Sequence, residues 1–188
     1  MINDYEATDP ITTDAKTVDT RDLSSDEIAS KLNDLIQICK DGEEGFRTAA
    51  EGVDSPELKS FFNECSQQRA QFASELQSLV SSLGGDPESS GSFSGAVHRG
   101  WMDLKAAIEG NDPKGVLNEC ERGEDYAKKA YREALENDRL PANIREVVQR
   151  QCDAVIATHD RVKILRDSAS HEADNDGPAA ASTSQTAY

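Results

Sequence analysis

We single out four side chains of this sequence as candidate metal ligands, namely Glu43, Glu121, Glu124 and His159. Carboxylate oxygens suit manganese, and imidazole suits iron and zinc. Helical proteins with a carboxylate-bridged pair of metals usually supply two Glu-x-x-His pairs, one from each of two helices. The sequence contains no such pair, because Ile156 stands three residues before His159. We therefore expect no cofactor, and the alternative is iron, manganese or zinc held at a degenerate carboxylate site.

The same residues also fit a different hypothesis, a network of buried charges that neutralise one another. Six polar residues fall at helical spacings among apolar ones, namely Glu43, Gln68, Arg69, Glu124, Gln151 and His159. At 1.5 Å of rise per residue, most of them reach a common layer of a helical bundle. Buried charge is costly unless it is paired, so we expect Arg69 to pair with Glu43 or Glu124. We favour this hypothesis over the metal site, because the positive charge of Arg69 does electrostatically what a cation would do.

The four cysteines also fall within apolar patterns, at positions 39, 65, 120 and 152. Four thiolates from four helices are one way to hold zinc. Free cysteine, however, is among the most often buried residue types and packs as a small hydrophobe. Nucleophilic catalysis would need a base beside a cysteine, and only His159 is available. We expect the cysteines to fill the core.

The spacing of apolar residues predicts an all-α protein. Residues at steps of three and four define long amphipathic helices. Their beginnings carry capping signals, namely Ser24 with Glu27, Ser55 with Pro56, and Asp112 with Pro113. The expected helices are 24–53, 55–83, a shorter one around 97–108, one from 112 to the break at 137–138, and one that contains 144–165.

The connections between these helices predict their order in space. A link of about one residue near Asp54 forces the first two helices to run antiparallel. The next connection is long and contains the short helix, so it can return along the whole bundle. The predicted fold is a ferritin-like four-helix bundle, with the short extra helix in the long crossover between bundle helices two and three.

Charge and composition restrict the partners and the compartment. The formal net charge of −16 disfavours nucleic acid and anionic membrane surfaces. No stretch has the ~20 apolar residues of a membrane span, and the first residues do not read as a leader. We expect a cytoplasmic protein in which residues 24–168 form the bundle, 1–23 a flexible acidic tail and 169–188 a second flexible tail.

Four stretches of the sequence resemble a bacterial family of ferritin-like four-helix-bundle proteins of unknown function. They are QQRAQFASELQSLV (67–80), HRGWMDLK (98–105), CERGEDYAKKAYREAL (120–135) and HDRVKILRD (159–167). The resemblance spans about residues 27–168. It implies a fold and no settled activity, since kinship of fold with ferritins does not confer iron chemistry.

Two functional hypotheses follow from these observations. In the first, the protein is non-catalytic and acts through self-association or a protein partner, with the exposed side of the helix around Trp101 as the natural surface. In the second, it is a metal-binding ferritin-like protein with a degenerate carboxylate site. We favour the first.

Overall fold

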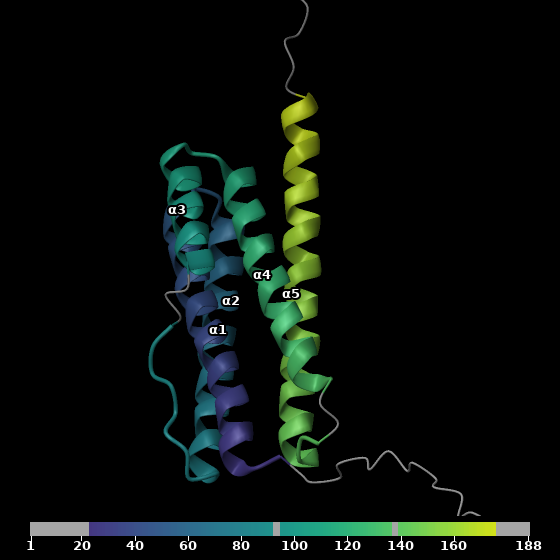
Figure 1. Cartoon of the computed structure of the whole chain (residues 1–188). Coiled ribbons are helices and arrows are strands. Elements are labelled where there is room, and N and C mark those ends of the chain that lie inside the picture. The colour runs from purple at the N-terminus through teal and green to yellow at the C-terminus, as the bar shows by residue number, and fades with distance from the viewer. Residues whose placement is uncertain (1–22, 92–94, 137–138, 176–188) are drawn as a thin grey trace, which may run out of the picture.

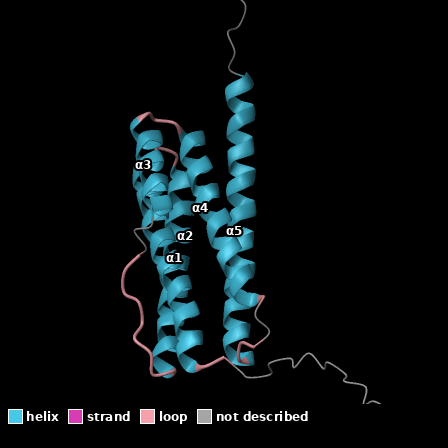
Figure 2. Ribbon diagram, in the orientation of Figure 1, coloured by secondary structure: helices cyan, strands magenta, loops and turns pink. Residues whose placement is uncertain are grey.

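The computed structural model describes residues 23–91, 95–136 and 139–175, and within these ranges the protein is all-α with no strand (Figure 2). Its five helices are α1 (Ser25–Gly52), α2 (Pro56–Ser82), α3 (Gly95–Glu109), α4 (Pro113–Leu135) and α5 (Ala142–Asn175). No helix in the described part of the chain combines the length and apolar character that crossing a bilayer demands. The all-α prediction is confirmed.

Local capping determines where the helices begin, as the sequence predicted. The Ser24 hydroxyl accepts a hydrogen bond from the Glu27 amide, and the Glu27 carboxylate accepts one from the Ser24 amide at 2.9 Å. Ser55 caps α2 ahead of Pro56, and Asp112 caps α4 ahead of Pro113. Each cap satisfies an amide that the first turn of a helix leaves without a partner.

The last helix is longer than the sequence predicted. Its apolar pattern ends near Leu165, yet α5 continues to Asn175. Ala169 packs against apolar side chains of the core, which gives the added length a partial anchor. The tails were expected at 1–23 and 169–188; residues 169–175 belong to α5, whereas 1–22 and 176–188 lie outside the described residues.

The helices form two antiparallel hairpins, α1 with α2 and α4 with α5 (Figure 1). The long connection after α2 carries α3 and returns the chain to the end at which α2 began. As a result α4 runs in the same direction as α2, and α5 runs in the same direction as α1. Helix α3 lies against α1 and α4.

Helix α3 approaches α1 closely at Gly52. A Cβ atom at this position would lie 2.5 Å from Cδ1 and from Cγ1 of Ile108. Real Cβ atoms do not approach other atoms so closely. The absence of a side chain at Gly52 therefore allows α3 to pack closely against α1.

The core consists of two apolar clusters, one towards each end of the long helices. Cys39, Phe72 and Val155 belong to the first cluster, whereas Phe46 and Val162 belong to the second. On every long helix the last buried residue of one cluster and the first of the other are seven positions apart, which is about two turns. Polar side chains occupy this boundary.

We predict that Leu76→Ala lowers the free energy of unfolding by about 2–5 kcal/mol. Leu76 is 0% exposed, so its truncation leaves a cavity in the first apolar cluster. Urea denaturation followed by circular dichroism measures the change. The control is Lys105→Ala on the exposed side of α3, which should alter stability by less than about 0.5 kcal/mol. Equal effects would show that Leu76 is not packed in the core.

Candidate functional site

Arg69 of α2 and Glu124 of α4 form an ion pair at the boundary between the two apolar clusters. The Arg69 Nη2 lies 2.5 Å from a Glu124 carboxylate oxygen, and the two side chains are 2% and 3% exposed. The guanidinium also lies over the Phe72 ring, 5.6 Å from its centroid. The sequence predicted a buried partner for Arg69 and left two candidates, of which the structure selects Glu124.

The two charges depend on each other because neither can reach solvent. Burial raises the pKa of the Glu124 carboxyl, and the charge and hydrogen bond of Arg69 act against that shift. Removing either partner would leave an uncompensated charge in the core, which is far more costly than losing both.

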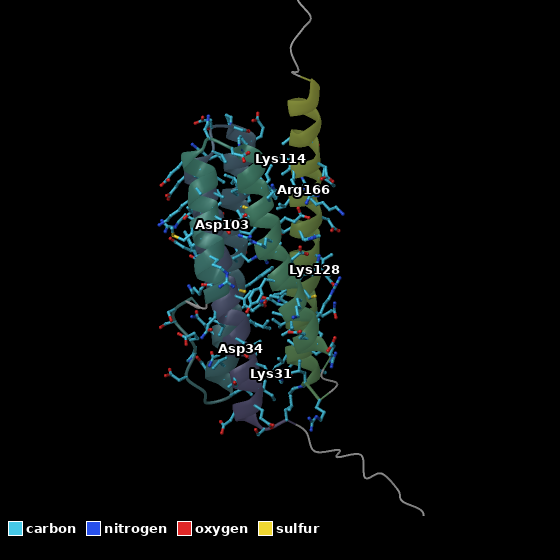
Figure 3. The ribbon with its side chains drawn as sticks, turned by 45° about the horizontal axis from the view of Figure 1, so that its top comes forward. Lys31, Asp34, Asp103, Lys114, Lys128 and Arg166 are labelled. Atoms are coloured by element: carbon cyan, nitrogen blue, oxygen red, sulfur yellow. The ribbon has the colours of Figure 1, made fainter. Side chains whose placement is uncertain are left out.

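Glu43 and Glu121, the two other acidic residues that the sequence singled out, each pair with a different cation. Glu43 is a third exposed and lies 3.3 Å from Lys40 on its own helix. Glu121 pairs with Arg166 of α5, whose side chain lies near α4 in Figure 3. Sequence reasoning did not anticipate Arg166, because its contact depends on the upper part of α5.

His159 lies at the surface edge of the polar layer, with its side chain 11% exposed. Its Nε2 is 2.9 Å from the ammonium of Lys128, and its Nδ1 is 2.9 Å from Asp160. Because an ammonium can only donate, Lys128 donates to Nε2 and the imidazole donates from Nδ1 to Asp160. Asp125 completes the cluster, 3.1 Å from Nε2. Two carboxylates, those of Asp125 and Asp160, thus lie beside His159.

The four candidate metal ligands are therefore distributed over separate ion pairs. Among the described residues, no three His, Cys, Asp or Glu side chains are grouped so that they could hold a metal ion. Glu124 pairs with Arg69, whereas His159 contacts Lys128 and Asp160. The two are therefore held by different cations.

A second buried network connects α1, α2, α4 and α5 beside the ion pair. The Tyr131 hydroxyl donates to the Gln151 side-chain oxygen at 2.8 Å and lies 3.1 Å from the Cys39 sulfur. The Gln151 amide in turn donates to Glu75 at 2.8 Å. Sequence reasoning placed Gln151 in the polar layer but missed Glu75, because Glu75 lies outside the apolar stripe of α2.

All four cysteines are free and buried. Burial raises the pKa of the Cys39 thiol to about 11 and that of Cys65 to about 12, and it also raises those of Cys120 and Cys152. The thiolate, which is the nucleophile and the metal ligand, is thus disfavoured at every site.

A cavity of about 390 Å³ lies between α1, α3 and α4, next to the ion pair. Arg69 and Glu124 line it together with four large apolar or aromatic side chains, Phe46, Trp101, Leu104 and Tyr126. Asp103 lines it from α3, on the side of the molecule away from α5 (Figure 3). Sequence reasoning did not predict this cavity.

A family model described as "Domain of unknown function (DUF2383)" matches residues 27–137 of the chain, which is more than half of it. The chain belongs to this family. The DUF2383 match includes both members of the Arg69–Glu124 pair and all three helices around the cavity, and it ends before α5. No curated protein matched the chain.

We predict that Arg69→Ala lowers the free energy of unfolding by about 3–5 kcal/mol, because it leaves the Glu124 carboxylate buried without a partner. The double variant Arg69→Ala with Glu124→Ala should recover part of that loss. Chemical denaturation of the two single variants and the double variant gives the coupling between the residues.

The matched control for this cycle is Arg150→Ala. Arg150 pairs with Glu75 across α2 and α5, but its side chain is 57% exposed. Loss of an exposed pair should cost about 1 kcal/mol or less. Similar losses for Arg69→Ala and Arg150→Ala would contradict the buried position of the Arg69 pair.

We also predict that the four thiols of the native protein resist iodoacetamide near neutral pH and react fully in denaturant. The reasons are their burial and raised pKa values, which keep the thiolate scarce. Intact-mass spectrometry counts the added groups. Rapid labelling of one thiol in the folded protein would show that its site opens to solvent.

Proposed function

We propose that this DUF2383 protein is a non-catalytic helical binding protein with a ferritin-like four-helix bundle, which α1, α2, α4 and α5 would form. Support for the bundle comes from the directions of these helices and from the long connection that carries α3. The short link between α1 and α2, together with that long crossover, is the connectivity of ferritin-like folds.

The Arg69–Glu124 pair is the observation that carries the non-catalytic proposal. A guanidinium occupies the middle of the polar layer, where its fixed positive charge satisfies the Glu124 carboxylate. Arg166 and Lys40 satisfy Glu121 and Glu43 in the same way. Carboxylates that already have cationic partners have little left to gain from binding iron, manganese or zinc.

Action would come through self-association or a protein partner in the cytoplasm. Met102 of α3 and Tyr126 of α4 are 55% and 51% exposed, and these two helices are neighbours. Exposed large apolar side chains on adjacent elements favour contact with another protein. The four free cysteines agree with a reducing compartment.

Elemental analysis of protein purified without chelator tests the proposal against its alternative, the degenerate metal site. We predict well under one iron, manganese or zinc atom per chain, and no change in Glu124→Gln or His159→Ala. One metal atom per chain that is lost in both variants would establish the metal site instead. The molar mass of the same sample in solution, compared with 20.4 kDa for one chain, distinguishes self-association from action through another protein.

A further inference from the structure

We propose that the cavity between α1, α3 and α4 binds a small, neutral and largely apolar organic molecule through a carbonyl or hydroxyl oxygen that accepts hydrogen bonds from Arg69. This is a small-molecule site in addition to the protein contacts proposed above. Its lining shares Tyr126 with the exposed surface proposed for those contacts.

The first observation is that Arg69 has unused donors at the cavity. Its side chain is 2% exposed, and its Nη2 pairs with the Glu124 carboxylate. Its Nε and Nη1 are buried and have no hydrogen-bond acceptor among the residues that the structure describes. A buried donor without an acceptor costs about 1–3 kcal/mol. Arg69 also lines the cavity, so a small turn of its side chain would bring these covered donors to an acceptor on a bound molecule.

The second observation is that helix-interior glycines keep the cavity open. Gly45 of α1, Gly100 of α3 and Gly123 of α4 all line it. A Cβ atom added at any of the three would meet no atom within 4 Å. Close helix packing therefore does not require glycine there, although glycine inside a helix costs roughly 0.5–1 kcal/mol relative to alanine. What the missing side chains preserve is space.

The charges around the cavity indicate a neutral ligand. Its lining contains three arginines and four acidic residues, namely Arg69, Arg99, Arg122, Asp41, Asp103, Glu119 and Glu124. Arg122 lies 2.7 Å from Asp103 and also pairs with Glu119, while Arg69 pairs with Glu124. The lining thus has no excess of positive charge, and a buried anion would lie close to Glu124 in a medium that screens poorly.

The arrangement of the two donors also disfavours a carboxylate. A carboxylate binds arginine in the bidentate mode by taking two N–H groups from one edge of the planar guanidinium. Nε and Nη1 do not share an edge, because the group that lies between them is Nη2. Separate oxygen acceptors, or one ligand oxygen together with water, fit these two directions better.

The size and walls of the cavity define the rest of the ligand. Ligand pockets have volumes of roughly 300–1,000 Å³, and this cavity of about 390 Å³ is at the small end of that range. Phe46, Trp101, Leu104 and Tyr126 provide apolar surface for the body of the molecule. A compact aromatic or aliphatic ketone, amide or alcohol has these properties.

The test is a fluorescence titration of the full chain with prodan, a neutral naphthyl ketone whose emission shifts when it leaves water. We expect saturable binding of one prodan per chain. The anion anilinonaphthalene sulfonate has a similar ring system and serves as the probe for charge. It should bind at least about tenfold more weakly.

Two variants locate the prodan site. Gly45→Leu places a side chain in the open space beside α1 and should abolish saturable binding. Arg69→Lys keeps a positive charge near Glu124 but removes the Nε and Nη1 donors, and it should weaken binding about tenfold, as expected for the loss of a hydrogen bond to a charged group. The matched control Arg150→Lys changes an arginine of an exposed pair and should bind prodan as the parent does. Circular dichroism checks that each variant is folded.

Three outcomes would overturn the proposal. They are the absence of saturable prodan binding to the parent protein, unchanged binding in either Gly45→Leu or Arg69→Lys, and tighter binding of the sulfonate than of prodan. None of them bears on metal content or on molar mass, so this site and the function proposed above can fail separately.

Discussion

The ion pair between Arg69 and Glu124 is the constraint on which the arrangement of the helices depends. A guanidinium in the middle of an apolar core is tolerable only where a carboxylate meets it, so Arg69 of α2 and Glu124 of α4 must lie at one height across the bundle. A slide of α2 by one turn, about 5.4 Å, would separate the charges while leaving apolar side chains opposite one another. The apolar clusters on either side supply most of the burial, and the pair fixes their alignment.

The two hairpins are joined unevenly around this pair. Between α2 and α5 the contacts include two polar pairs, Arg150 with Glu75 and Thr158 with Gln68. On the opposite side, α1 and α4 meet through the Cys39 and Tyr131 side chains and the first apolar cluster. Apolar contacts thus contribute on the α1–α4 side, and hydrogen bonds and ion pairs contribute on the α2–α5 side. Polar pairs between two helices require particular residues to lie opposite each other, whereas apolar packing is less selective.

The helix boundaries could be predicted from the sequence because they depend on local chemistry. The capping box at Ser24 and the Ser55 cap with Pro56 act within one turn, and both lie where the pattern placed them. From the sequence, the ion-pair partner of Arg69 could be limited to Glu43 or Glu124, but the sequence could not decide between them. Glu43 and Glu124 have similar heights, and only the rotation of α1 about its axis turns Glu43 towards Lys40.

The cavity could not have been predicted, for a related reason. In the sequence, Gly45 and Gly123 look like isolated glycines that merely lower the stability of a helix. Nothing in the neighbouring residues shows that both border the same cavity. That space exists because α3 packs across α1 and α4. The position of α3 depends on the connections on either side of it, and the apolar pattern does not predict their conformation. Arg166 likewise reaches Glu121 only because α5 extends well past that level of the bundle.

The close approach at Gly52 means that this one position sets the distance between α1 and α3, and with it the width of the cavity. Any side chain there would collide with Ile108 and tilt α3 away from α1. Leu104, one turn earlier on α3, would move with it and shift a wall of the cavity. A change of a single methyl group at a residue that does not line the cavity would thus alter its width, so the selectivity of the site can be tuned from outside it.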